Sequence, residues 1–210
     1  MTKMEAGFLA VLLLAIFMTM WYIIAKRVNL KRQNELWRIL SPNIKKYTQK
    51  VGFRRFGSSG FQISFRGKSP LSKVEVTFVL MDRENFLHYI LQKASGKRDE
   101  VYLKASFLCN PDFRLSSAGD GLKPLEFGSL GDLKLFSDDS SRAARILLNN
   151  EIRGLLGRMK VKGISISREE PHLIVRCNVE DDTIKLLIPL AEKIASACCP
   201  SDRKDHSLSP

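Results

Sequence analysis

The pattern of apolar and polar positions is most one-sided near the start of the chain, where residues 7–25 form an unbroken apolar run. The run carries no charged side chain, and Thr19 is its only strongly polar residue. A helix rises about 1.5 Å per residue, so a run of this length reaches roughly across the ~30 Å hydrocarbon core of a bilayer. Trp21 and Tyr22 lie near its end, where aromatic rings favour the headgroup level. The pattern predicts a transmembrane helix over residues 7–25, after a short N-terminal segment of residues 1–6.

Two other interpretations of the apolar run fit its composition less well. A cleaved signal peptide would explain the basic Lys3, but the run is long for the apolar region of a signal sequence. No clear small-x-small cleavage site precedes the basic cluster that follows the run. A buried helix of a soluble protein would need a polar face, which the run lacks. The composition therefore favours an anchor that stays attached.

After the run, apolar residues recur at helical spacing over residues 26–51. Leu36 and Leu40 share one helix face. Ser41-Pro42 is expected to interrupt this helix and to start another, with Ser41 as the N-cap and Pro42 at the first helical position. We predict that residues 26–51 form a basic, amphipathic juxtamembrane connector in two helical pieces.

Several segments within residues 52–200 alternate at a period of two, which is typical of half-buried strands. We expect strands over residues 52–56, 61–65, 74–80, 101–107, 133–135, 164–166 and 173–177. Helical spacing separates them, and the expected helices begin near Asp82, Ser137 and Asp181. Short turns and single helices between strands favour an α+β fold with a mostly antiparallel sheet and about four helices. The polar residues 201–210 are expected to form a disordered tail.

Most of the positive charge lies in one short segment that follows the apolar run. The chain has 210 residues, a net charge of +12 and 44% hydrophobic residues, which excludes a disordered or low-complexity chain. Residues 26–55 hold ten basic side chains against Glu35 alone, a net charge of +9, and the rest is nearly balanced. This distribution disfavours nucleic acid as a partner, which prefers basic residues spread over a folded surface. The positive-inside rule places the N-terminus outside and the C-terminal domain in the cytoplasm.

The basic cluster also predicts a contact with lipid headgroups. Each juxtamembrane Lys or Arg gains about 1 kcal/mol from an anionic leaflet, within a Debye length of its surface. We expect membrane-surface contacts from Lys26, Arg27, Lys31, Arg32, Arg38, Lys45 and Lys46. Trp21 and Tyr22 are the expected interfacial aromatic residues.

The cysteines and histidines show no metal-ligand spacing, so no metal site is expected. They are Cys109, Cys177, Cys198, Cys199, His88, His172 and His206. In a cytoplasmic domain the thiols are expected to be reduced. The adjacent Cys198 and Cys199 are expected to be small buried residues at a helix end, and lipid attachment is the alternative.

No familiar catalytic motif occurs. The sequence has no GxxxxGK[ST] phosphate loop, no GxSxG and no HExxH. Adjacent acids at 138–139, 169–170 and 181–182 are explained by a helix start, a hairpin turn and a second helix start. Asp120, in a glycine-rich loop, is the loop residue that could most readily serve a function, although an ordinary surface loop explains it as well. No catalytic or cofactor-binding residue, and no cofactor, is predicted.

The last third of the chain resembles a group of uncharacterised prokaryotic membrane-tethered proteins. The similarity lies in the stretch Phe136-Ser137-Asp138-Asp139 and in Ala143, Arg145, Leu147 and Leu148, followed by a β-hairpin and a closing helix. It implies a membrane-attached cytoplasmic α+β domain and no particular activity.

Together these patterns predict a single-pass membrane protein whose cytoplasmic domain, residues 52–200, acts as a binding or scaffolding module near the bilayer. Its expected partners are the lipid bilayer with its anionic headgroups and a protein that the sequence does not identify. A membrane-tethered enzyme, with a site assembled only in space, is the first alternative. Nucleic-acid binding at the membrane is the second. The sequence determines neither the activity nor the oligomeric state.

Overall fold

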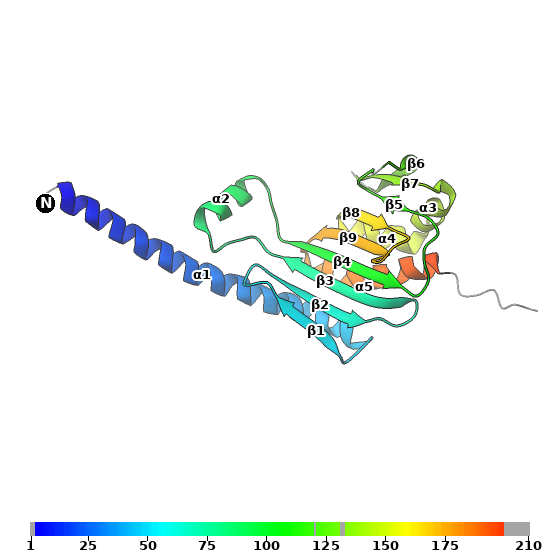
Figure 1. The fold of residues 1–210 in the computed structure, drawn as a ribbon, viewed down its shortest axis with the longest axis horizontal. Helices are drawn as coiled ribbons and strands as arrows, with labels where there is room; N and C mark the ends of the chain where they lie inside the picture. Colours follow the sequence, from blue (N-terminus) through cyan, green and yellow to red (C-terminus); the bar gives the residue numbers. More distant parts are fainter. Residues whose placement is uncertain (1–2, 120, 131–132, 200–210) are drawn as a thin grey trace, which may run out of the picture.

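The computed structural model describes residues 3–119, 121–130 and 133–199, and these residues form an α+β fold, as predicted (Figure 1). The five helices are α1 (Lys3–Lys45), α2 (Phe86–Ala94), α3 (Ser140–Leu147), α4 (Asn150–Met159) and α5 (Asp181–Cys198). The strands are β1 (Val51–Arg55), β2 (Gly60–Arg66), β3 (Leu71–Val79), β4 (Glu100–Phe107), β5 (Leu115–Ser116), β6 (Lys123–Leu130), β7 (Leu133–Ser137), β8 (Val161–Ile166) and β9 (Leu173–Asn178). The expected tail, residues 201–210, lies outside the described residues.

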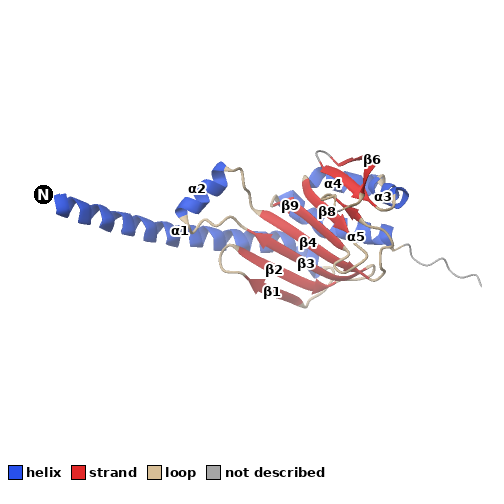
Figure 2. Cartoon of the chain, turned by 45° about the horizontal axis from the view of Figure 1, so that its top comes forward, coloured by secondary structure: helices blue, strands red, loops and turns tan. Residues whose placement is uncertain are grey.

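The strands form one sheet in the order β1-β2-β3-β4-β9-β8-β5-β7-β6, and every pair of neighbours is antiparallel. Alternate residues of the central strands are buried, and the register brings Val76 opposite Leu103 and Leu103 opposite Val175. The C-terminal half of α1, together with α5, packs on this apolar face (Figure 2). The opposite face of the central strands is polar and carries no helix in the described part of the chain, so the sheet has one covered and one open side.

Helix α1 is continuous from Lys3 to Lys45, so the predicted break at Ser41-Pro42 is wrong. Pro42 has no N–H to donate to the carbonyl of Arg38, but the hydroxyl of Ser41 donates to that carbonyl at 3.4 Å. Leu40 and Ile44, on either side of the proline, are both buried against the sheet and α5. The side-chain donor and the packing together hold the helix straight through the proline.

The apolar part of α1 is long enough and apolar enough to cross a membrane, and its side chains are exposed in the isolated protein. Figure 1 shows this part projecting away from the sheet, whereas the second half of the same helix lies against it. The expected connector, residues 26–51, is therefore built into the folded domain. Leu36, Leu40 and Ile44 belong to its hydrophobic core.

The cysteines differ from the expectation of reduced thiols. Cys109, in the loop after β4, and Cys199, at the end of α5, form a disulfide with their Cα atoms 5.7 Å apart. Cys177 and Cys198 are free, and burial raises the pKa of both thiols to about 12. The two free thiols stay protonated at neutral pH, which makes them poor nucleophiles.

Candidate functional site at the junction of helix α1 and the sheet

One face of α1 is buried from Ala25 onward, and its buried side chains change from mostly polar to apolar along the helix. Near the apolar span the buried residues are Ala25 and the polar Asn29 and Gln33, and further on they are Leu36, Leu40 and Ile44. The intervals of three and four residues keep these side chains on one helix face. Along α1, the buried contacts are therefore polar next to the apolar span and apolar further on, where the helix joins the core.

Gln33 attaches α1 to the turn between β1 and β2. Its side-chain amide nitrogen donates to the carbonyls of Ser58 at 2.8 Å and Gly57 at 3.3 Å. Gly57 has a positive φ of 66°, a conformation that favours glycine. Ser58 in turn donates its hydroxyl to Glu84, in the segment that leads into α2. A single buried amide therefore holds the hairpin turn against the helix.

Arg83 joins α1 to the beginning of β4. Its guanidinium donates to Asn29 Oδ1 at 2.6 Å and to both carboxylate oxygens of Asp99, at 3.1 and 3.0 Å. Asp99 also accepts the backbone N–H of Met81 at 2.8 Å, and Asn29 donates to the Met81 carbonyl at 3.3 Å. The Arg83 and Asp99 side chains are only 18% and 13% exposed, so water screens this ion pair little.

Trp21, nearer the N-terminus of α1, adds an aromatic contact. Its indole N–H donates to the carbonyl of Arg83 at 2.8 Å. Its ring packs edge-to-face against that of Phe86 in α2, with the two ring centroids 4.8 Å apart, and the Phe86 centroid lies 5.3 Å from that of Phe17. The ring of Tyr89, one turn further along α2, has its centroid 6.0 Å from that of Trp21. Helix α2 is therefore held beside the last turns of the apolar span. Of the two predicted interfacial aromatic residues, Trp21 has this structural role, and Tyr22 is exposed with Lys26 above its ring.

These contacts make the junction rigid. Backbone, amide, guanidinium and indole groups from α1, from the β1–β2 turn and from the segment 81–99 form hydrogen bonds with one another. Among the described residues, the buried Oε1 of Gln33 has no partner. A helix that is continuous with the core and held through Trp21, Asn29 and Gln33 cannot swivel freely, as a flexible linker would allow. The junction therefore fixes the direction of the apolar part of α1 relative to the sheet.

The predicted headgroup contacts are spread along α1 instead of gathered at one level. Six of the seven residues are exposed, and Arg32 is half-buried, near Glu35 at 3.3 Å and Asp181 at 3.6 Å. At about 1.5 Å per residue, Arg32 lies roughly 10 Å beyond Ala25 along the helix axis and Lys45 roughly 30 Å beyond it. A Debye length is about 8–10 Å, so an upright α1 leaves Lys26, Arg27, Lys31 and Arg32 in range of the headgroups.

A second polar cluster lies on the open face of the sheet, and sequence reasoning did not find it. Glu100 accepts from Arg176 at 3.0 and 3.1 Å, from Lys162 at 3.1 Å and from the Tyr102 hydroxyl at 2.9 Å. Burial alone would raise the pKa of Glu100, but hydrogen bonds from Arg176, Lys162 and Tyr102 outweigh burial and hold the pKa below its usual range. Tyr102 is two residues from Glu100, which is strand spacing, but no sequence signal links Glu100 to the two distant cations.

Replacing Glu100 by Gln tests this cluster. The variant is expected to lose about 1–2 kcal/mol of unfolding free energy at pH 7, because the amide is a weaker acceptor for charged donors. A carboxyl with a lowered folded-state pKa stabilises the fold above its unfolded pKa of about 4.3 and loses this effect as the pH falls. Urea unfolding at pH 7 and at about pH 3 should show the difference between variant and wild type shrinking at acid pH. Glu151→Gln, at an exposed ion pair with Lys193, is the control and should change little at either pH.

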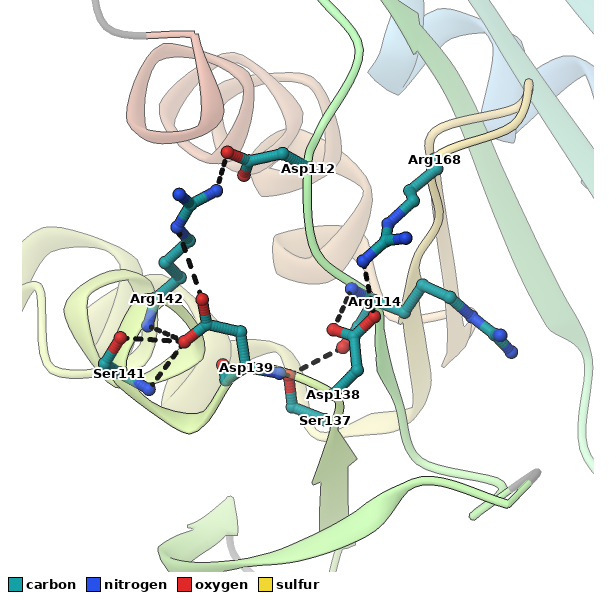
Figure 3. Close-up of polar contacts among 8 residues, drawn as sticks. All are labelled: Asp112, Arg114, Ser137, Asp138, Asp139, Ser141, Arg142 and Arg168. Atoms are coloured by element: carbon teal, nitrogen blue, oxygen red, sulfur yellow. Dashed lines mark hydrogen bonds and ion pairs between the residues drawn. The ribbon is translucent and has the colours of Figure 1, made fainter.

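The adjacent acids at 138–139 serve the fold, as predicted, and Figure 3 shows the two carboxylates turned to different partners. Asp139 caps α3 and accepts from the backbone N–H groups of Ser141 and Arg142 at 3.0 and 3.1 Å. Asp138 accepts the backbone N–H of Arg114 at 2.6 Å and pairs with Arg168 at 2.9 Å. These bonds fix the loop before α3 to β5 and β8–β9, so the acids are structural. The acids at 169–170 lie in the β8–β9 connection and those at 181–182 in the first turn of α5, as expected.

Among the described residues, the surface hollows away from the junction include one of about 450 Å³, lined by Trp37, Ile44 and Val51, and two others that are lined by ion pairs. One, of about 210 Å³, is lined on the open sheet face by Lys73, Glu75, Lys104 and Glu170, and Lys73 pairs with Glu75 at 2.7 Å. The other, of about 290 Å³, lies between Asp112, Arg142 and the end of α5, and Asp112 pairs with Arg142. In each of these two hollows, an acidic side chain forms an ion pair with a basic side chain of the same hollow.

The histidines are not brought together. His172 is buried, and its Nδ1 accepts the backbone N–H of Phe107 at 2.8 Å, whereas His88 is exposed on α2 and contacts Gln92. Within the described residues no group of three or more His, Cys, Asp or Glu side chains could hold a metal ion. His206 and Asp120 lie outside the described residues.

Comparison of the chain with models of protein families and with curated proteins finds no match. The functional assignment therefore depends on the geometry of the junction and of the open sheet face.

Proposed function

We propose that this chain is a single-pass membrane-anchored protein whose α+β domain is a binding or scaffolding module, held in a fixed position at the cytoplasmic surface. The observation that carries the proposal is the continuity of α1, which is an apolar span at one end and part of the domain core at the other. A domain that only needed retention at the membrane would work on a loose linker. A rigid connection is useful when one surface must face a defined direction.

The open face of the sheet is the surface best suited to a protein partner. Its side chains include Gln62, Glu75, Thr77, Tyr102, Lys104 and Arg176, a mixture of both charges with an aromatic residue. Mixed polar surfaces of this kind fit transient protein contacts better than a polyanion such as nucleic acid, which prefers one sign of charge. The geometry of the described residues adds no specific support for nucleic-acid binding or for catalysis.

Two features of the chain favour opposite sides of the membrane for the domain. The charges that follow the span favour the cytoplasmic side, whereas the Cys109–Cys199 disulfide is typical of an oxidising compartment. Cytoplasmic disulfides do occur in hyperthermophiles, so the bond is compatible with the orientation that the charges favour. We base the proposed orientation on the charges, because topology responds directly to Lys and Arg near a span.

Flotation and protease protection test the proposal. The full-length protein is expected to float with membranes after a carbonate wash, with its first 25 residues still attached. The domain should be digested in inside-out vesicles and protected in right-side-out vesicles. Recovery of a shortened chain in the soluble fraction would disprove the anchor. Digestion only in right-side-out vesicles would reverse the orientation and leave the anchor in place.

A further inference from the structure

Helix α2 presents its most apolar stripe away from the protein. Leu87, Ile90 and Leu91 are 63%, 46% and 68% exposed, and with the exposed Ala94 they follow the i, i+3, i+4, i+7 spacing of one helix face. The side chains on the opposite face, Phe86, Tyr89 and Gln92, point toward the protein. An amphipathic helix on a soluble domain has the reverse arrangement, with its apolar stripe against the core.

The position of α2 along α1 explains this arrangement. Phe86 contacts Phe17 and Trp21, which lie eight and four residues before the end of the apolar span at Ala25. At about 1.5 Å per residue, these contacts lie roughly 12 and 6 Å inside the end of the span. When α1 crosses a bilayer, α2 is therefore at the depth where headgroups give way to acyl chains.

The charges around α2 suit the same depth. The helix itself has one charged residue, Lys93, in its last turn, and Lys97 and Arg98 follow it on the way to β4. All three are exposed, and their long side chains can extend toward lipid phosphates from an apolar environment. The segment before α2 is mixed, with Asp82, Arg83 and Glu84, so the basic side lies at its C-terminal end. An apolar stripe beside such basic residues is typical of helices that lie in a membrane interface.

We propose that α2 is a second membrane contact, which lies in the headgroup–acyl boundary of the bilayer that α1 crosses. The inference rests on the proposed anchor, because α1 sets the depth of α2. An apolar groove between the two helices, about 170 Å³ and lined by Trp21, Ile24, Val28 and Tyr89, opens at the same level and is filled by lipid chains. Arg83 lines the groove as well and faces the polar junction.

A second copy of the chain is the competing occupant of the stripe. A stable protein interface buries about 1,200–2,000 Å², and three or four aliphatic side chains on a nine-residue helix provide much less. The bilayer needs no separate association step, since α1 already brings α2 into it. The stripe is therefore better explained by lipid.

A depth measurement on the full-length protein tests the proposal. An environment-sensitive fluorophore is attached to Leu91→Cys or to Leu148→Cys, with Cys177 and Cys198 replaced by alanine and the Cys109–Cys199 bond kept. Leu148 is a matched control, because it is 56% exposed and follows α3, at the far end of the domain from the membrane span (Figure 1). Both proteins are reconstituted into phosphatidylcholine–phosphatidylglycerol vesicles that contain nitroxide-labelled lipid.

The label at residue 91 is expected to be quenched at least about twofold more than the label at residue 148, since an interfacial helix lies ~5–10 Å deep. Equal quenching in protein that floats with the vesicles would overturn the inference while the anchor stands. Self-quenching at residue 91 without lipid quenching would assign the stripe to a second copy and also overturn it. Protein that does not float would overturn the anchor and this inference together.

Hydrogen exchange on the unmodified protein gives an independent measurement if a label disturbs the fold. In vesicles the amides of α2 are expected to exchange more slowly than those of α3, a helix of similar length. Packing within the protein alone would favour the opposite order, because α3 buries Ala143, Ile146 and Leu147 whereas α2 buries only Gln92. Equal or faster exchange in α2 would also overturn the inference.

Discussion

A chain that begins at residue 52 is expected to be unfolded, whereas a chain that begins at residue 26 is expected to fold. The shorter chain lacks Leu36, Leu40 and Ile44, which are fully buried against the sheet and α5. Removing one such side chain costs about 2–5 kcal/mol, and a domain has only about 5–15 kcal/mol of stability in total. The loss of all three, with the Gln33 contact to the β1–β2 turn, exceeds what the fold can tolerate.

Circular dichroism melting curves of the two chains in mild detergent measure this effect. A cooperative transition is expected for residues 26–210 and none for residues 52–210. Leu40→Ala in the longer chain removes only one of the three buried side chains and should lower the unfolding free energy by about 2–5 kcal/mol. Arg38→Ala, at an exposed position on the same helix, is the control and should have little effect. A cooperative melt of residues 52–210 would contradict the assignment of α1 to the core.

Reduction of the Cys109–Cys199 bond is expected to lower the unfolding free energy by about 4 kcal/mol. The bond joins residues 90 positions apart, and closing a loop of that length removes much of the entropy of the unfolded chain. For a protein of this size, such a loss corresponds to a decrease in Tm of about 10 °C. Differential scanning fluorimetry with and without reductant measures it.

The neighbouring thiol provides the control for that experiment. Cys199→Ala should reproduce the effect of reductant and abolish any further response to it. Cys198→Ala removes a free thiol beside the bond, so its Tm should remain close to that of the wild type and still fall on reduction. Equal Tm values for the two variants, with no response to reductant in the wild type, would show that the bond does not stabilise the fold.

Local patterns in the chain were sufficient to place most of the elements. The period-two alternation at Phe61, Ile63 and Phe65 and at Val74, Val76 and Phe78 coincides with β2 and β3, because neighbouring residues of a strand face opposite sides. The helix over 86–94 was located correctly, although its cap is Asn85 and not Asp82, since several polar residues in one turn can serve as a cap. The break expected at Ser41-Pro42 failed because packing outweighed a local signal.

The amino-acid sequence by itself determined the apolar span, the α+β class and the charge asymmetry around the span, because each depends on residues close together in the chain. Only the tertiary structure decided where α1 and α2 pack. The junction of Asn29, Arg83 and Asp99, the pairing of Glu100 with Lys162 and Arg176, and the Cys109–Cys199 bond join residues that are 16 to 90 positions apart. Periodicity reports which side of an element is apolar. Whether that side meets the core, as in α1, or faces away from it, as in α2, depends on where the fold places the element.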